Sequence, residues 1–136
     1  MSIAVDTSAV VALVKGEPTA PWVEEQLDAA LARLMSAVTF VVLSLVLEAY
    51  TSGAVTGSRT IDRLDIEVVD VDRRHANAAV DAWRRFGKGR HPARLNLGDC
   101  FSYAVARIAA VPLLCVGDDF RQTDLPVLAP PVPVNP

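Results

Sequence analysis

The chain has 136 residues, of which 51% are hydrophobic and 21% are charged, and its formal net charge at pH 7 is −3. This length and composition are typical of one folded domain and argue against an intrinsically disordered chain. The longest nearly apolar run, residues 37–47, is shorter than the roughly 18 residues of a membrane-spanning helix, and the N-terminus lacks the pattern of a secretory signal. We therefore expect a cytoplasmic protein with no membrane span, in which Cys100 and Cys115 are reduced core thiols.

The first half of the chain alternates short strand-like runs with helical segments. The expected elements are a strand at 3–5, the start of a buried helix at 9–14, a helix from Pro21 or Trp22 through Leu34, a short strand or helix N-cap at 35–39, and an apolar helix at 40–50. Residues 51–60 are rich in glycine and predict a loop, with room for one helical turn through Leu64.

The second half continues the same alternation. The expected elements are a strand at 66–71, an amphipathic helix at 73–86 with Ala76, Ala79, Val80 and Trp83 facing inward, a basic loop at 87–96, a helix at 97–110, a buried strand at 112–116 and an edge strand near 126–129. Strands that alternate with helices predict an α/β fold with a mainly parallel sheet. We expect one domain over residues 1–128 and a Pro-rich tail over 129–136.

Acidic residues recur at structurally similar places. Asp6 ends the first strand, Asp118 and Asp119 follow the strand at 112–116, and Asp99 lies in the first turn of an apolar helix. Sites in parallel α/β sheets form beyond the carboxyl ends of the strands, so these acids can converge there. Converging carboxylates repel each other unless a cation lies between them, and oxygen ligands favour Mg²⁺ or Mn²⁺. Helix capping and ordinary turn positions remain the alternative explanation for each acid.

A basic segment interrupts this acidic chain. Residues 82–98 contain no acidic residue but hold Arg84, Arg85, Lys88, Arg90 and Arg94. Such a segment predicts local contact with a polyanion, with a solvated basic helix end as the alternative. The two histidines, at positions 75 and 91, have no partner spacing typical of a metal site or a catalytic triad, and we expect both at the surface.

Three segments together resemble one protein family. The stretches "VDTSAVVALV", "KGRHPARLNLGDCFSYAVA" and "PLLCVGDDFRQTDL" occur in the order seen in PIN-domain ribonucleases, and they are most similar to the VapC toxins of bacterial toxin–antitoxin pairs. The resemblance covers residues 1 to about 125. It implies a three-layer α/β/α sandwich with four or five strands, cleavage of RNA that depends on Mg²⁺ or Mn²⁺, a cytoplasmic homodimer, and a VapB-type antitoxin as partner.

The resemblance also implies roles for individual residues. Asp6 and Asp99 match the two metal-binding aspartates of the family, and Ser8 matches the hydroxyl residue that orients the first of them. Asp118 and Asp119 match the acidic cluster after the penultimate strand, where Asp119 is the better fit. The resemblance assigns the basic segment to the RNA backbone, which it contacts without sequence preference.

One position departs from the family pattern. Val42 stands where these ribonucleases have a glutamate, and the next acid along that helix is Glu48. Six helical residues turn about 240°, so Glu48 points away from the face of residue 42 and is either a peripheral site residue or a solvated one. The departure predicts an attenuated enzyme, and the alternative is a catalytically inactive module that binds RNA or an antitoxin. A phosphatase-like or receiver-like domain with Asp6 as the nucleophile is a weaker alternative.

Overall fold

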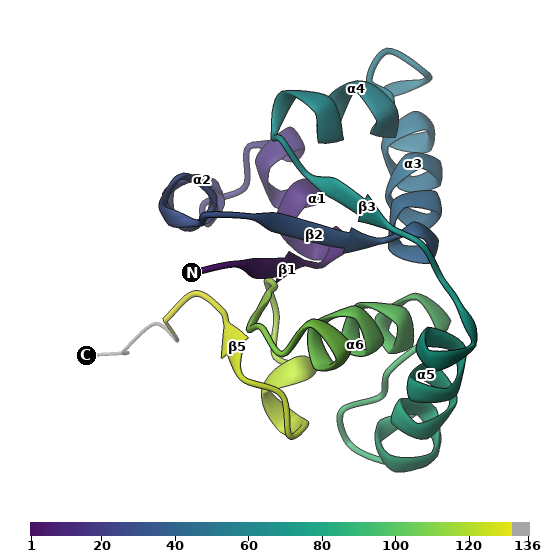
Figure 1. The fold of residues 1–136 in the computed structure, drawn as a ribbon. Coiled ribbons are helices and arrows are strands. Elements are labelled where there is room, and N and C mark those ends of the chain that lie inside the picture. Colours follow the sequence, from purple (N-terminus) through teal and green to yellow (C-terminus); the bar gives the residue numbers. More distant parts are fainter. Residues whose placement is uncertain (132–136) are drawn as a thin grey trace.

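A computed structural model describes residues 1–131 of the chain, and within them a five-stranded sheet lies at the centre of the molecule (Figure 1). All neighbouring strands pair in parallel, and their order across the sheet is β3-β2-β1-β4-β5. The strands are β1 Ile3–Val5, β2 Arg33–Ser36, β3 Glu67–Val69, β4 Leu113–Leu114 and β5 Val127–Leu128. The predicted parallel α/β fold is therefore confirmed.

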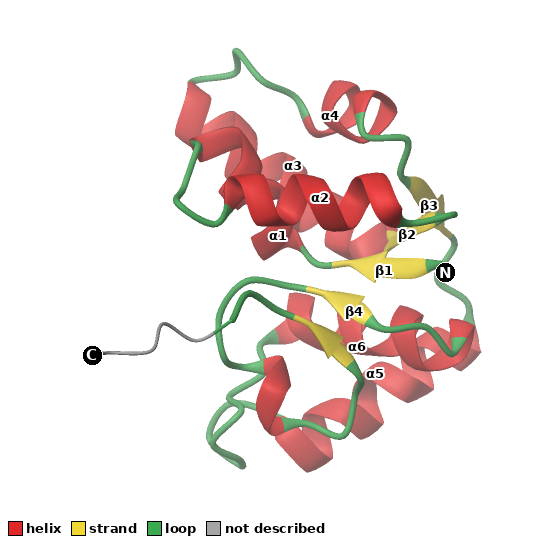
Figure 2. Ribbon diagram, turned by 90° about the vertical axis from the view of Figure 1, so that its left-hand side faces the viewer, coloured by secondary structure: helices red, strands yellow, loops and turns green. Residues whose placement is uncertain are grey.

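Helices cover both faces of this sheet. They are α1 Thr7–Lys15, α2 Ala20–Ala29, α3 Ala37–Thr51, α4 Gly57–Arg63, α5 Arg73–Phe86, α6 Leu97–Ala109 and the short 3₁₀ helix η1 Phe120–Gln122. Figures 1 and 2 show α5 and α6 on one side of the sheet, and α1, α2 and α4 on the other. None of the helices within residues 1–131 is long and apolar enough to cross a membrane.

The alternation of side chains along the strands divides the core in two. Ala4 and Leu113 pack with α5 and α6, whereas Val5 and Leu114 pack with the helices of the opposite face. Successive strand residues point to opposite faces of a sheet, so each central strand contributes to both cores. This arrangement is the three-layer sandwich that the sequence resemblance implies.

Two elements of the first half differ from the sequence-based expectation. The helix expected to run through Leu34 ends at Ala29, because residues 33–36 are needed as β2 between β1 and β3. The expected loop at 51–60 contains the start of a regular helix, α4, which is capped by Thr56. Gly57 allows α4 to pack closely against α3, since a Cβ at that position would lie 2.1 Å from Ser44 Oγ.

The bounds of α5 are as predicted, but its buried face is not. Its buried residues are His75, Ala79, Ala82 and Phe86, whereas the exposed fractions of Val80 and Trp83 are both 44%. The predicted inward face was therefore wrong for Val80 and Trp83, because the helix is rotated so that Ala82 and Phe86 meet α6. The expectation that His75 lies at the surface was also wrong. Both cysteines are free and buried, as expected.

The C-terminal segment is described only in part. Residues 132–136 of the expected tail lie outside the described residues, and the division between domain and tail after residue 128 stays a prediction.

Candidate active site

Asp6 sits at the point where β1 ends and α1 begins. Its carboxylate is buried, with only 5% of the residue exposed, and it receives three hydrogen bonds. Ser8 donates two of them to Oδ2, from its backbone N at 3.1 Å and from Oγ at 2.7 Å. Ser102 Oγ donates the third to Oδ1 at 2.6 Å. These donors offset the cost of burying the charge and fix the orientation of the carboxylate.

The two serines are themselves held by other segments of the chain. Ser8 Oγ accepts a hydrogen bond from Val116 N at 3.0 Å, just beyond β4. Ser102 Oγ lies 3.0 Å from Thr39 Oγ1 on α3. Because the single hydroxyl proton of Ser102 is directed to Asp6, Thr39 is the donor in this contact. A chain of hydroxyl groups thus connects the first aspartate to α3, α6 and the end of β4.

Sequence reasoning missed Ser102 and Thr39. Ser102 lies three residues after Asp99 on α6, a spacing that places two side chains on the same face of a helix. That spacing is the signal that identifies Ser102 as a neighbour of the acids. Thr39 carries no comparable signal, because only the packing of α3 against α6 brings it to the site.

Asp99 has two roles that the sequence offered as alternatives. At the third position of α6 it completes a capping box, in which Asp99 Oδ2 accepts from Asn96 N at 3.0 Å and Asn96 Oδ1 accepts from Asp99 N at 2.9 Å. Burial, together with the charges of Asp6 and Asp119, raises the pKa of Asp99 to about 6, against the lowering effect of the Asn96 hydrogen bond. The charges of two acids from other segments of the chain therefore act on Asp99.

The two acids after β4 differ in their surroundings. Asp119 lines a small pocket of about 250 Å³ together with Asp99, Asn96, Lys88 and Arg94. The side chain of Asp118 is 80% exposed, and its carboxylate lies 3.7 Å from the guanidinium of Arg121. Of this pair, Asp119 is the one that shares a pocket with Asp99.

Val42 packs beside the start of α6. A Cβ at Gly98 would lie 3.2 Å from Val42 Cγ2, so the valine meets the residue that precedes Asp99. Glu48 is exposed near the other end of α3, about 9 Å further along the helix axis. Of these two residues of α3, Val42 is the one that contacts the first turn of α6.

The five basic residues of the basic segment, residues 82–98, do not form one surface. Lys88 and Arg94 line the pocket of Asp99 and Asp119. Arg90 stacks on Trp83, with its guanidinium carbon 4.0 Å from the ring centre. The remaining two lie elsewhere: Arg84 is exposed on α5, and Arg85 forms an ion pair with Asp124 at 2.8 Å. Only part of the basic segment is therefore placed to hold a ligand at the acids.

The other histidine, His91, is half-buried in the basic loop. Its Nδ1 accepts a hydrogen bond from Ala93 N at 3.0 Å, and its ring packs edge-on against Phe86 at 5.1 Å. These contacts assign it to the internal structure of the loop.

The pocket of Asp99 and Asp119 is better suited to a divalent cation that keeps several water ligands than to one bound by protein ligands alone. Within residues 1–131 no three side chains of the His, Cys, Asp or Glu type are grouped closely enough to enclose a metal ion. Burial and the charges of Asp6 and Asp119 nevertheless raise the pKa of Asp99, so a cation bound here would relieve the repulsion that Asp99 experiences. Mg²⁺ usually retains several waters and takes only one or two protein carboxylates, so the donor set fits that ion.

Comparison with known proteins identifies the family of the chain. Residues 3–125 match the PIN domain. The chain is 43% identical over 131 residues to ribonuclease VapC30 of Mycobacterium tuberculosis, an alignment that covers 93% of this chain and 98% of that protein. It is 42% identical over 125 residues to ribonuclease VapC of Mycolicibacterium smegmatis, with 89% and 95% covered.

Solved structures show the same fold at low sequence identity. The toxin VapC20 of Mycobacterium tuberculosis, described as cleaving the sarcin–ricin loop, superposes with a TM-score of 0.69 at 18% identity, covering 91% of this chain and 96% of that one. A toxin–antitoxin complex from Klebsiella pneumoniae gives a TM-score of 0.70 at 18% identity, covering 93% and 96%. With the matched domain and the close relatives above, these likenesses lead to one conclusion: the chain belongs to the PIN-domain family, and within it to the VapC ribonucleases.

Proposed function

We propose that this chain hydrolyses phosphodiester bonds of RNA with a divalent cation, Mg²⁺ or Mn²⁺, held by Asp6 and Asp99. The observation that carries the proposal is the meeting of acids from distant segments: Asp99 and Asp119 line one pocket, and the charges of Asp6 and Asp119 add to burial in raising the pKa of Asp99. When bound, the cation would supply Lewis-acid activation of water and stabilisation of the leaving oxygen.

The protein groups have separate tasks in this proposal. Asp6 is held in one orientation by Ser8 and Ser102, which makes it the fixed ligand. Asp99 would be the second ligand, and the capping box fixes its backbone and orients its carboxylate. Lys88 and Arg94 line the same pocket and would hold the phosphate backbone of the RNA.

We propose further that Val42 attenuates the enzyme. A valine offers no oxygen ligand where it packs beside Gly98, so the cation has fewer protein partners than it has with a glutamate there. The alternative, an inactive module that binds RNA or an antitoxin, is favoured by the same residue. The decisive difference between the two is whether any metal-dependent cleavage remains.

The test compares cleavage of total RNA by this chain and by its Val42→Glu and Asp6→Asn variants. We expect weak cleavage that EDTA abolishes, an increase with Val42→Glu, and a loss with Asp6→Asn. If the unchanged chain does not cleave but binds RNA, it is a binding module. The Tm of the unchanged chain and of Val42→Glu is also measured with and without millimolar Mg²⁺. An equal shift in Tm for the two proteins would contradict the placement of residue 42 at the metal site.

We also propose a cytoplasmic homodimer that binds a VapB-type antitoxin. Several structurally similar proteins are described as VapBC complexes, including one from Rickettsia felis bound to a promoter DNA fragment. On this chain, α3 exposes Val41 and Leu45, two apolar side chains that a partner or second copy would cover. Sedimentation of the isolated chain tests the dimer, and a monomer at tens of micromolar would contradict it.

A further inference from the structure

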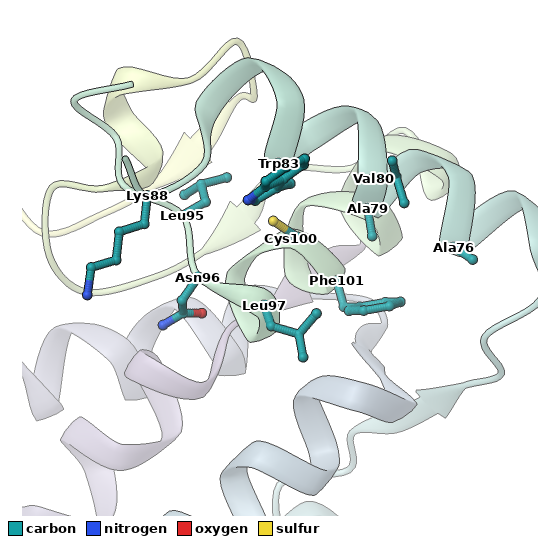
Figure 3. A pocket seen from close by; sticks show the side chains of 10 residues that line it. All are labelled: Ala76, Ala79, Val80, Trp83, Lys88, Leu95, Asn96, Leu97, Cys100 and Phe101. Carbon is teal, nitrogen blue, oxygen red and sulfur yellow. The ribbon is translucent and has the colours of Figure 1, made fainter. Parts of the chain in front are cut away.

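An open apolar groove runs between α5 and α6, with a volume of about 460 Å³. Figure 3 shows the side chains that line it, among them Val80 and Trp83 from α5, and Leu97 and Phe101 from α6. Val80 and Trp83 are each 44% exposed, and Leu97 is 74% exposed. Large apolar side chains gathered at one open hollow are typical of a binding surface.

The groove adjoins the pocket of Asp99 and Asp119. Lys88 and Asn96 line both hollows and so lie between them. Figure 3 shows the two polar side chains together at one end of the groove and Ala76 at the other end. A ligand that extends from the pocket into the groove would therefore contact Lys88.

Two neighbours pack against Trp83. The guanidinium carbon of Arg90 lies 4.0 Å from the centre of its ring. Gly87 leaves room for the indole, because a Cβ there would lie 2.5 Å from Trp83 Cδ1. A half-exposed indole next to positive charge is a surface on which a flat aromatic group can stack.

We propose that this groove binds one unpaired nucleobase of the RNA, next to the phosphate that is cleaved. The inference rests on the proposed ribonuclease function and adds a base-binding subsite to it. Single-stranded RNA is recognised by bases stacked on aromatic side chains and by cations along its backbone. Here Trp83 and Phe101 provide the aromatic surface, and Lys88 provides the cation between base and scissile phosphate.

The experiment uses tryptophan fluorescence on a chain that cannot cleave. The chain has two tryptophans, so Trp22→Phe leaves Trp83 as the only reporter, and Asp6→Asn prevents cleavage of the probe. A short single-stranded RNA is the ligand, and a ribose-phosphate chain of equal length without bases is the comparison. We expect the RNA to quench Trp83 fluorescence and the abasic chain to bind without quenching.

Affinity is then measured for Trp83 variants by an assay that does not use tryptophan, such as polarisation of a labelled RNA. Trp83→Leu should weaken RNA binding by roughly 5- to 150-fold, the range for loss of one stacked base, while Trp83→Phe keeps most of the affinity. Leu31→Ala changes an apolar side chain that is 86% exposed outside the groove, and should leave affinity unchanged.

The outcomes separate the two proposals. If RNA binds but Trp83→Leu has the affinity of the unchanged chain, the subsite is wrong and the nuclease proposal stands. If Trp83→Leu changes the sedimenting mass and leaves RNA affinity unchanged, a second copy covers the groove and the subsite is again wrong. If RNA does not bind and is not cleaved by the catalytic chain, the proposed function itself fails.

Discussion

The two ends of α6 hold charges in opposite ways. Near its start, Asp99 shares its surroundings with Asp6 and Asp119, and burial together with these charges raises its pKa to about 6. Further along, Tyr103 and Arg107 face Asp124 on the segment before β5, where Arg85 also reaches.

Three neighbouring side chains donate hydrogen bonds to the carboxylate of Asp124. Tyr103 OH donates to Oδ1 at 2.7 Å, Arg85 donates to Oδ2 at 2.8 Å, and Arg107 donates to the same oxygen. Burial alone would raise the pKa of Asp124, but these hydrogen bonds and charges outweigh it and lower the pKa. One helix thus has an end where donors lower the pKa of a carboxylate, Asp124, and an end where burial and neighbouring charges raise the pKa of another, Asp99. We call these the compensated and the uncompensated end, and the proposed cation would bind at the second.

The largest expected effect is at the uncompensated end. Asp99→Asn keeps the oxygen that accepts from Asn96 N but removes a metal-binding charge, so RNA cleavage should fall by roughly 100-fold or more. Without metal, the same variant should be more stable at neutral pH than the unchanged chain, because a repelled charge is gone. Urea unfolding and a cleavage assay on the same preparations measure both. A variant that loses stability and activity together would mean that Asp99 is mainly a structural cap.

The next effect concerns the hydroxyl chain behind Asp6. Ser102→Ala removes the 2.6 Å hydrogen bond to Asp6 and leaves Thr39 Oγ1 without its acceptor. We expect cleavage to fall roughly 10- to 100-fold, as for groups that orient metal ligands. The control is Ser58→Ala, which changes an exposed helix serine. Equal cleavage by both serine variants would contradict an orienting role for Ser102.

At the compensated end the expected effect is on stability alone. Tyr103→Phe removes the hydroxyl that links Asp124 to Arg107 and Arg85, so the free energy of unfolding should fall by about 1–3 kcal/mol. Cleavage per folded molecule should stay within a few-fold of the unchanged chain. A large loss of cleavage at unchanged stability would show instead that this cluster positions the acids after β4.

The smallest expected effect is the pH dependence of stability. The pKa of Asp99 rises from 3.8 to about 6 on folding, so the folded state binds more protons between these values, and the contribution of Asp99 to stability falls as pH increases through that window. Asp124 has a lowered pKa, so its contribution is present above its unfolded pKa and is lost as pH falls through the folded one.

Substitution separates these two contributions. In metal-free buffer, Asp99→Asn should remove a decrease of about 1–2 kcal/mol between pH 4 and 6, discounted for solvent screening because the residue is only half-buried. Asp124→Asn should leave that decrease in place. Identical pH profiles for the unchanged chain and Asp99→Asn would contradict the uncompensated cluster.

Much of this arrangement is predictable from the sequence because it follows local patterns. The bounds of α5 and the acids that follow β1 and β4 can be read from periodicity and from the rule that parallel strands end at one edge of the sheet. What failed depends on tertiary packing. The rotation of α5 that exposes Trp83 is set by contacts with α6, and β2 is a strand because it lies between β1 and β3. Neither contact is encoded within the segment itself.

The same limit applies to the site. Asp6 and Asp99 are visible as acids in apolar surroundings, but Thr39 is an ordinary helix residue until α3 meets α6. Likewise, the basic segment sends some side chains to the pocket of Asp99, one to Trp83 and one to Asp124. These directions cannot be found by counting charges in the sequence.

The position of β1 at the middle of the sheet has a consequence for biosynthesis. Asp6 is synthesised well before its neighbours: Ser102 follows it by 96 residues, and Val116 follows Ser8 by 108 residues. Long-range parallel pairing forms late, since the chain must close a large loop before the contacts form. The surroundings of Asp6 therefore become ordered only after β4 has been synthesised, and the proposed RNA cleavage would begin no earlier.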